Sequence, residues 1–238
     1  MEKKSINPLA MTEYILASKS PRRQMLLRNL FNHFIVLDTD VEETKFPGEK
    51  PAAYVLRLAK GKALAAGKRM GENSLPEVVV IAADTIVVDQ DEMLGKPKDP
   101  EDARIILDRL KGKTHQVLSG LAVYHLPTRE MRSRVITTEV TMRHYSEKEI
   151  LDYIASGDPF DKAGAYAIQN ESFNPAPEFS GCFANVMGLP LCHLSLLIQE
   201  IKGNLDSRIA DRCQESINYQ CPVYPRILSG EHIQLLNE

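Results

Sequence analysis

An unbroken apolar stretch that contains one carboxylate constrains this chain more than any other feature. Residues 78–89 read Val-Val-Val-Ile-Ala-Ala-Asp-Thr-Ile-Val-Val-Asp, and β-branched side chains dominate. A continuous run of this kind predicts a β-strand that is covered on both faces. Asp84 interrupts the run, and burying an ionised side chain is costly unless it is paired or binds a cation. Asp84 therefore either caps a turn or has a chemical role.

Size and charge narrow the class of protein. At 238 residues the chain can form one large domain, or one domain with an appendage. Its formal net charge of −3 gives no global attraction to nucleic acid or anionic lipid, so we expect neither as a partner. No apolar run approaches the ~20 residues of a membrane span, and the N-terminus lacks a signal-peptide core, so we expect a cytoplasmic protein. The four cysteines form no Cys-x-x-Cys pair and are expected to be free thiols, with a zinc site using His193 as the less favoured alternative.

Interleaved strands and helices predict a mixed α/β domain. Expected strands, besides the central one, lie at residues 14–17, 34–37, 114–125, 131–144 and 179–186. Expected helices lie at residues 51–68, 100–111, 146–156 and 190–201. We divide the chain into a leader (1–13), one domain (14–202) and a C-terminal extension (203–238), which is expected to hold at most a short helix and a packed segment.

A serine-rich turn follows the first expected strand and opens a helix. Residues 18–23 read Ser-Lys-Ser-Pro-Arg-Arg, in which Ser20 suits the N-cap and Pro21 the first helical position. The turn places two hydroxyls, free backbone N–H groups, Arg22 and Arg23 at a helix N-terminus, which is a place that binds phosphate. The alternative is a plain N-cap with solvated arginines.

An acidic loop follows the second expected strand. Residues 38–43 read Asp-Thr-Asp-Val-Glu-Glu, and clustered carboxylates hold Mg²⁺ or Mn²⁺ beside phosphates. A solvated acidic loop is the alternative. Lys62 lies on the exposed part of the 51–68 helix, and Lys96 lies near the end of the central strand. Together with Asp84 as the ionised group that activates water, these pieces suit metal-assisted hydrolysis of a phosphate ester or anhydride.

Other phosphate chemistries fit the sequence less well. The chain lacks the Gly-x-Gly-x-x-Gly and P-loop motifs. Residues 34–41, Phe-Ile-Val-Leu-Asp-Thr-Asp-Val, resemble the first motif of haloacid-dehalogenase-type phosphatases, with Asp38 as a nucleophile and Asp84 with Asp89 as the late acidic motif. This alternative is weaker because the two motifs would be unusually close and the serine-rich turn would have no role.

A series of motifs occurs in order from about Tyr14 to Ile201. They are Leu16-Ala-Ser-Lys-Ser-Pro-Arg-Arg23, Asp40-Val-Glu-Glu43, Leu58-Ala-Lys-Gly-Lys-Ala63, Ala83-Asp-Thr-Ile-Val87, Gly95-Lys-Pro97, residues 112–120, Asp161-Lys-Ala-Gly-Ala-Tyr166 with Ile168-Gln169, and Asn185-Val-Met-Gly-Leu-Pro190. Taken together, these collinear motifs resemble the Maf family of nucleoside triphosphate pyrophosphatases. The family shares the architecture of the inosine-triphosphate pyrophosphatase group, a mixed twisted sheet with flanking helices around a central cleft. The extension after Ile201 is longer than the family pattern requires.

The resemblance implies cleavage between the α- and β-phosphates, giving a nucleoside monophosphate and pyrophosphate. It implies a divalent cation, Mg²⁺ or Mn²⁺, held by Glu43 and Asp84, with Asp84 as the proton acceptor. The implied catalytic residues are Asp84, Glu43, Lys62 and Lys96. The implied substrate-binding residues are Ser18, Ser20, Arg22, Arg23, Thr85, Lys162 and Gln169.

Within the family, three positions resemble the branch that acts on dTTP and UTP. These are Arg22, Thr85 and Gln169, whereas the branch acting on 7-methyl-GTP differs there. Hydroxyl and amide groups match the carbonyl edge of a pyrimidine, and modified pyrimidines would fit the same pocket. A nucleotide-binding regulator of cell division is the second interpretation, and the sequence leaves a homodimer open.

Overall fold

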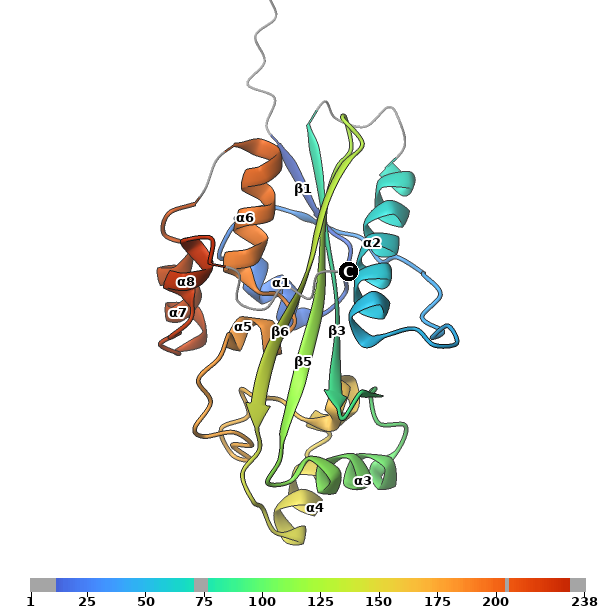
Figure 1. Cartoon of the computed structure of the whole chain (residues 1–238), viewed down its shortest axis with the longest axis vertical. Helices are drawn as coiled ribbons and strands as arrows, with labels where there is room; N and C mark the ends of the chain where they lie inside the picture. Colours follow the sequence, from blue (N-terminus) through green and yellow to red (C-terminus); the bar gives the residue numbers. More distant parts are fainter. Residues whose placement is uncertain (1–11, 71–76, 204–205, 232–238) are drawn as a thin grey trace, which may run out of the picture.

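The computed structural model describes residues 12–70, 77–203 and 206–231. Its centre is a six-stranded mixed sheet in the order β2-β1-β3-β5-β6, with β4 paired to β3 (Figure 1). The strands are β1 (Glu13–Leu16), β2 (Ile35–Val36), β3 (Val78–Asp89), β4 (Glu92–Leu94), β5 (Thr114–His125) and β6 (Glu130–Thr141). β1 runs parallel to β2 and β3, whereas β3, β5 and β6 are antiparallel. The predicted mixed α/β class is confirmed.

Eight α-helices surround the sheet in the described part of the chain. They are α1 (Pro21–Leu27), α2 (Pro51–Met70), α3 (Pro100–Leu110), α4 (Glu147–Ala155), α5 (Phe183–Val186), α6 (Leu191–Lys202), α7 (Ile209–Ile217) and α8 (Tyr224–Leu228). Two 3₁₀ turns, Asp158–Asp161 and Ala163–Ala165, follow α4. None of the helices in the described ranges is both long and apolar enough to cross a bilayer.

Capping chemistry sets several of the helix boundaries. Ser146 and Glu149 form the predicted capping box at the start of α4, each accepting a backbone N–H of the other. At α3, the Asp99 side chain accepts the backbone N–H of Asp102 at 2.8 Å. These local interactions explain why both helices begin where the sequence predicts.

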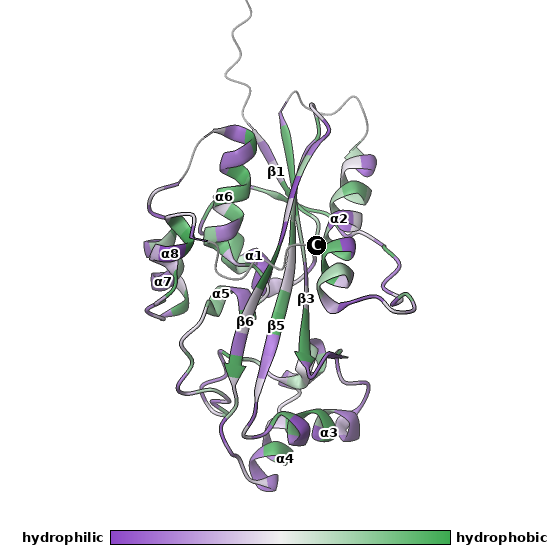
Figure 2. Cartoon of the chain, in the orientation of Figure 1, coloured by the Kyte–Doolittle hydropathy of each residue, from purple (hydrophilic) through white to green (hydrophobic). Residues whose placement is uncertain are grey.

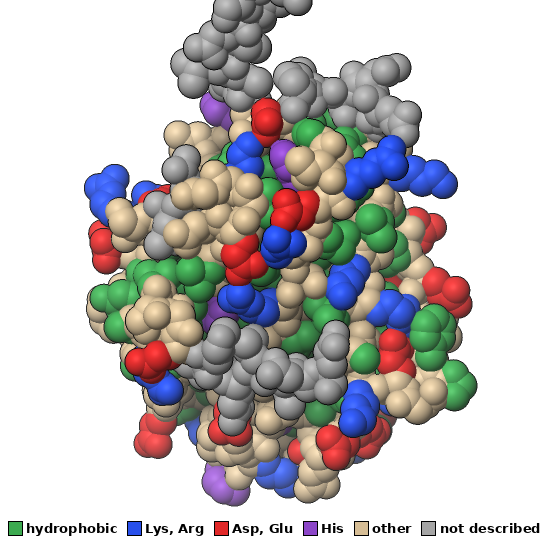
Figure 3. Space-filling view, turned by 45° about the horizontal axis from the view of Figure 1, so that its top comes forward, with side chains coloured by type: hydrophobic (Ala, Val, Ile, Leu, Met, Phe, Trp, Pro, Cys, Tyr) green, Lys and Arg blue, Asp and Glu red, His purple; other side chains and the backbone are tan. Residues whose placement is uncertain are grey.

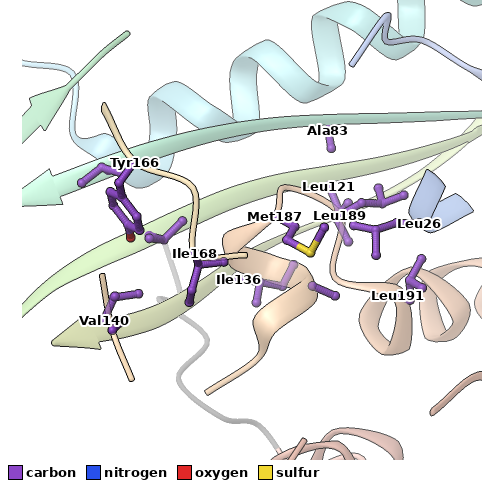
Figure 4. Close-up of a cluster of buried hydrophobic side chains, with 14 of the residues drawn as sticks. Leu26, Ala83, Leu121, Ile136, Val140, Tyr166, Ile168, Met187, Leu189 and Leu191 are labelled. Atoms are coloured by element: carbon purple, nitrogen blue, oxygen red, sulfur yellow. The ribbon is translucent and has the colours of Figure 1, made fainter. Parts of the chain in front are cut away.

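The central strand β3 separates two apolar layers. It is buried at every position except the half-buried Thr85, and it is largely hydrophobic in Figure 2. Alternate side chains point to opposite faces of a strand. One face packs against α2, and the other packs against α1, α5 and α6. Figure 4 shows side chains of the second layer, with α2 on the far side of the sheet.

The strand pairing along one edge of β3 is interrupted beside Asp84 and Thr85. β1 pairs with β3 up to Ile81, and β4 pairs with it from Val87 onward. Among the described residues no strand pairs with this edge between Ala82 and Ile86, while β5 continues along the opposite edge. The sheet therefore has a gap beside Asp84 and Thr85.

Two predictions about secondary structure are wrong. The expected strand at 179–186 is instead a loop that leads into the short helix α5, because Phe179 and Phe183 pack with Tyr219 of the extension rather than beside another strand. The extension is also more ordered than expected. It forms α7 and α8, which pack against α6 on the side away from the sheet (Figure 1). The predicted leader falls almost entirely outside the described residues, and Glu13 belongs to β1.

Candidate active site

A cleft of about 690 Å³ opens at the gap in the edge of β3. Such a volume lies within the usual range for a small-molecule site. All eleven side chains predicted to bind substrate, cation or water line this one cleft: Ser18, Ser20, Arg22, Arg23, Glu43, Lys62, Asp84, Thr85, Lys96, Lys162 and Gln169. They come from segments between residues 18 and 169, so the fold brings distant parts of the chain together.

The serine-rich turn folds as its sequence predicts. Pro21 is the first residue of α1, and the N-cap Ser20 accepts the backbone N–H of Arg23 at 3.5 Å. Ser18 Oγ in turn accepts the backbone N–H of Ser20 at 3.2 Å. The turn thus presents hydroxyls and a helix N-terminus to the cleft, an arrangement suited to an anion.

Arg23 is held by three acceptors at once. Its Nε donates to the carbonyl of Gly188 at 2.9 Å, and its two terminal nitrogens donate to Ser18 Oγ at 3.2 Å and Thr85 Oγ1 at 3.1 Å. Burial lowers the pKa of the guanidinium, an effect that the negative charge of Asp84 opposes. Arginine remains charged at neutral pH despite such shifts, so Arg23 fixes a positive charge in the wall of the cleft.

Asp84 shares one ammonium group with Glu43. Lys62 Nζ donates to Asp84 Oδ1 at 2.6 Å and to Glu43 Oε1 at 2.9 Å. The side chains of Lys62 and Asp84 are each 12% exposed, whereas that of Glu43 is 62% exposed. Lys62 was expected on the exposed part of α2, but its long side chain reaches back into the cleft. Asp84 thus has the charged partner that its burial requires.

The pKa of Glu43 reflects the cations around it. Burial acts to raise this pKa, but the hydrogen bond from Lys62 and the charges of Lys62, Lys96 and Arg23 outweigh burial and lower it. Glu43 is therefore ionised at neutral pH. Lys96 is exposed and lines the cleft, and its positive charge acts on the Glu43 carboxylate.

The side chains of Asp84 and Thr85 point to opposite faces of β3. Asp84 points toward α2, where it meets Lys62, and Thr85 points toward α1 and α5, where it meets Arg23. Both side chains nevertheless line the same cleft. No described strand pairs with β3 beside these two residues, so the cleft reaches both faces of the strand around its open edge. The gap in the sheet therefore brings the Asp84–Lys62–Glu43 cluster and the Thr85–Arg23 pair into one site.

The remaining predicted residues form a second wall. Arg22 pairs with Asp161 at 2.9 Å. The ammonium of Lys162 donates to the backbone carbonyl and carboxylate of Asp158, at 2.6 and 2.9 Å, and to the Asp161 carboxylate at 2.5 Å. Three acceptors fill its donor capacity. Gln169 lines the cleft and is exposed, so its amide is accessible.

Three contributing residues were not singled out from the sequence. Gly188 supplies the carbonyl for Arg23 and has a φ of 105°, and a Cβ there would lie 3.3 Å from both Arg23 Nε and Thr85 Oγ1. Ser119 is fully buried and lies 2.9 Å from Thr85 Oγ1. Asp161 holds Arg22. The sequence signal that could identify Ser119 is a serine at an inward position of an apolar strand, between Val117 and Leu121.

The surroundings of Asp38 differ from those of Asp84. Asp38 also lines the cleft, but its side chain is 55% exposed and pairs with the exposed Lys19 at 2.6 Å. It follows β2, which forms the outer edge of the sheet. Asp38 therefore lacks the enclosed, cation-bound environment that Asp84 has.

The donor set of the cleft fits a hard divalent cation. Asp84 and Glu43 are carboxylates brought together by one lysine, and Mg²⁺ commonly takes one or two carboxylates plus substrate phosphates. Within residues 12–70, 77–203 and 206–231 no group of three or more His, Cys, Asp or Glu is arranged to hold a metal. Substrate oxygens would therefore have to complete the coordination. The four cysteines are free thiols.

Comparison with known proteins shows which family the chain resembles. The chain is 44% identical over 180 residues to a protein of Citrifermentans bemidjiense named dTTP/UTP pyrophosphatase, which covers 76% of this chain and 91% of that protein. A Yersinia pestis protein of the same name is 46% identical over 181 residues, covering 76% and 89% of the two chains. The Staphylococcus aureus Ham1 structure is 20% identical, with a TM-score of 0.40, and covers 55% of this chain and 72% of that one.

The family match extends over nearly all of the sheet and the helices that build the cleft. The sequence model described as Maf-like protein matches residues 13–201, from the start of β1 to the last turn of α6. This range includes every predicted site residue and leaves α7 and α8 beyond it. The chain therefore belongs to the Maf family.

Proposed function

We propose that this chain is a nucleoside triphosphate pyrophosphatase that acts on dTTP and UTP. The observation that carries the proposal is the Asp84–Lys62–Glu43 cluster, in which Asp84 and Lys62 are largely buried, and which shares one cleft with the serine-rich turn and Arg23. Asp84, a carboxylate that can accept a proton, thus lies in the same cleft as a turn suited to bind phosphate. The names of the relatives in Citrifermentans bemidjiense and Yersinia pestis support the same activity.

In the proposed reaction the bridge between the α- and β-phosphates is cleaved. Water supplies the new oxygen, its proton passes to the Asp84 carboxylate, and the products are the nucleoside monophosphate and pyrophosphate. Lys62 orients the Asp84 carboxylate, because its ammonium lies 2.6 Å from Oδ1. A positioned general base of this kind typically contributes about 10²- to 10⁴-fold to a rate.

Cationic and hydroxyl groups of the cleft bind the substrate in this proposal. Ser18, Ser20 and the N-terminus of α1 hold phosphate oxygens, and the charges of Arg22, Arg23 and Lys96 offset the charge that develops on them. Lys162, whose ammonium is held by Asp158 and Asp161, positions the segment whose Asp161 pairs with Arg22. Thr85 and Gln169 contact the base.

A divalent cation, Mg²⁺ or Mn²⁺, belongs to this proposal. Glu43 and Asp84 would hold it, together with phosphate oxygens of the substrate. When bound, such an ion offsets negative charge on the phosphates and polarises the bond that breaks.

The test is hydrolysis of dTTP and UTP by the purified protein with Mg²⁺ or Mn²⁺. We expect pyrophosphate rather than single phosphate as the product. Asp84→Asn should lower turnover by at least about 10²-fold with an unchanged circular dichroism spectrum. Asp91→Asn, in the exposed β3–β4 turn where Asn tolerates the φ of 67°, is the matched control and should remain active.

The outcome also separates this reaction from the dehalogenase-type alternative. Release of single phosphate, accompanied by a covalent phosphate adduct at Asp38, would overturn the proposal. A fully active Asp84→Asn protein would overturn the assigned role of Asp84 while leaving the substrate class in place.

A further inference from the structure

A chain of hydrogen bonds runs from the cleft into the buried side of the sheet. Arg23 donates to Thr85 Oγ1 at 3.1 Å, and Thr85 Oγ1 lies 2.9 Å from Ser119 Oγ. Ser119 Oγ lies 3.3 Å from the backbone carbonyl of Asn185, which can only accept. Thr85 is half-buried at the cleft, and Ser119 is fully buried behind it.

Only one direction of donation satisfies all of these contacts. The Arg23 guanidinium can only donate, so Thr85 oxygen accepts from it. The Asn185 carbonyl can only accept, so Ser119 gives its single proton there. The contact between the two hydroxyls then requires Thr85 to donate to Ser119. Chains in which each hydroxyl both donates and accepts are mutually strengthening, and a buried hydroxyl left unpaired is costly.

The direction of this chain makes Thr85 an acceptor toward the cleft. A hydroxyl has one proton and two lone pairs. The proton of Thr85 is committed to Ser119 and one lone pair to Arg23, so a single lone pair remains for a ligand. Phosphate oxygens also only accept, and they gain nothing from such a group. A ligand must instead bring an N–H or O–H donor to Thr85.

We propose that Ser119 is a positioning residue that makes the cleft select bases with an imino N–H. This inference rests on the proposed function, and it gives a physical reason why, among pyrimidines, uracil and thymine are accepted and cytosine is not. Uracil and thymine carry an N–H at N3, whereas N3 of cytosine is a lone-pair acceptor. Cytosine would place its N3 lone pair against the lone pair of Thr85 Oγ1. A site that leaves polar groups unpaired in this way discriminates strongly.

The test compares UTP, CTP and 3-methyl-UTP, in which a methyl group replaces the N3 hydrogen. The wild-type protein should prefer UTP to both of the others in kcat/KM. Ser119→Ala frees the Thr85 proton to turn toward the cleft and to meet cytosine N3. The preference for UTP over CTP should therefore fall by about tenfold, the effect of one hydrogen bond. Discrimination against 3-methyl-UTP should persist, because its N3 has neither a hydrogen to donate to Thr85 nor a free lone pair to accept the Thr85 proton.

Ser119→Ala removes one oxygen without leaving the Asn185 carbonyl unpaired, because the backbone N–H of Gly188 also donates to it at 2.9 Å. A merely structural role for Ser119 would lower kcat/KM for all three nucleotides by a similar factor. An unchanged UTP-to-CTP ratio in Ser119→Ala, or equal use of UTP and 3-methyl-UTP by the wild-type protein, would overturn the inference. The second result needs no variant and does not depend on whether the variant folds.

Calorimetric binding of the same three nucleotides to Asp84→Asn separates this inference from the proposed function. Selective binding of UTP without any release of pyrophosphate by the wild-type protein would overturn the proposed function alone. Pyrophosphate release with equal use of UTP and CTP would overturn only the inference. Failure of all three nucleotides to bind would overturn both.

Discussion

At the residue scale, the site depends on side chains that each satisfy several partners. Arg23 is the clearest case, because its planar fork reaches Gly188, Ser18 and Thr85 together. A lysine ammonium is a point charge on a flexible stem and cannot reproduce this geometry. The charge of Arg23 and its shape therefore contribute separately to the cleft.

Arg23→Lys tests the contribution of shape. We expect kcat/KM for UTP to fall by about 10- to 100-fold, since charge-assisted hydrogen bonds contribute about 1.5–3 kcal/mol each and at least one would be lost. Steady-state kinetics measures the change. Arg28→Lys, at the exposed C-cap of the same helix, is the control and should behave as the wild type. Equal activity of Arg23→Lys and Arg28→Lys would contradict the role of the fork.

The sequence predicted some of these residues for physical reasons that are local. Asp84 stood out because a carboxylate in an apolar strand needs a partner, and Ser20 with Pro21 carries its capping chemistry in adjacent positions. Ser119 and Gly188 were not predicted, because their partners lie on other elements. Lys62 was placed on an exposed helix face, because helical periodicity says where a side chain begins and not how far it reaches.

At the element scale, α2 is positioned by its close approach to β5. A Cβ on Gly120 would lie 2.3 Å from the backbone carbonyl oxygen of Val55, so only glycine allows α2 to pack there. Because α2 carries Lys62, the same contact places the ammonium beside Asp84. A residue remote from the chemistry thus sets its geometry.

Gly120→Ala should displace α2 from the sheet. We expect the free energy of unfolding to fall by about 1–3 kcal/mol, as in other overpacked interiors, and kcat to fall with it. Urea unfolding measures the first effect. Gly95→Ala is the matched control, because nothing lies within 4 Å of the added Cβ. Equal stabilities of the two variants would show that α2 does not depend on this contact.

The capping box of α4 should leave a signature in the pH dependence of stability. Hydrogen bonds from the backbone and hydroxyl of Ser146, and the pairing with Arg143, lower the pKa of Glu149 from 4.5 to about 2. A lowered carboxyl pKa stabilises the folded state above the unfolded value, and this contribution disappears as pH falls from 4.5 toward about 2.

Glu149→Gln keeps a side-chain acceptor for the cap but removes the charge. Its Tm should be lower than that of the wild type at pH 7, and the difference should shrink below pH 4.5. Thermal melts over this pH range measure the effect. Glu147→Gln, in the same helical turn, should show a smaller difference at neutral pH. A difference that grows on acidification would contradict the direction of the shift.

Elements with local signals were predicted well, whereas elements defined by tertiary contacts were not. α3 and α4 have side-chain caps in adjacent sequence, and β3, β5 and β6 have long apolar or β-branched runs. In contrast, α7 has no side-chain hydrogen bond at its N-cap, Arg208. The 179–186 segment has strand-like composition, but packing against the extension decides its conformation.

At the scale of the whole molecule, the extension is a third layer rather than a loose tail. In Figure 1 α7 and α8 lie outside α6, which itself covers the sheet. Arg212 Nε donates to the carbonyl of Asn29 at 2.6 Å, and Tyr219 donates to the carbonyl of Gly181 at 3.2 Å. The extension therefore contacts the segments that follow α1 and precede α5. Elsewhere on the surface, acidic and basic side chains are interspersed over the face shown in Figure 3.

Ile227→Ala tests whether this layer contributes to stability. Ile227 is 3% exposed and packs with Cys192 and Ala210. We expect its truncation to lower the free energy of unfolding by about 2 kcal/mol or more. Leu64→Ala, whose leucine is 51% exposed on α2, is the matched control and should cost much less. Chemical denaturation compares the two variants, and equal losses would mean that the extension packs loosely.

The gap in the edge of β3 has a consequence for how such a protein can change over generations. Asp84 and Thr85 are neighbours in sequence but serve opposite faces of the sheet. Substitutions at Thr85 and Ser119 alter one lobe of the cavity, while the Asp84–Lys62–Glu43 cluster lies on the α2 side of the sheet. Selection can therefore retune which nucleotide is accepted without rebuilding the hydrolytic machinery. The gap in the pairing of β3 thus gives the cleft a base-selecting side and a hydrolytic side that can vary separately.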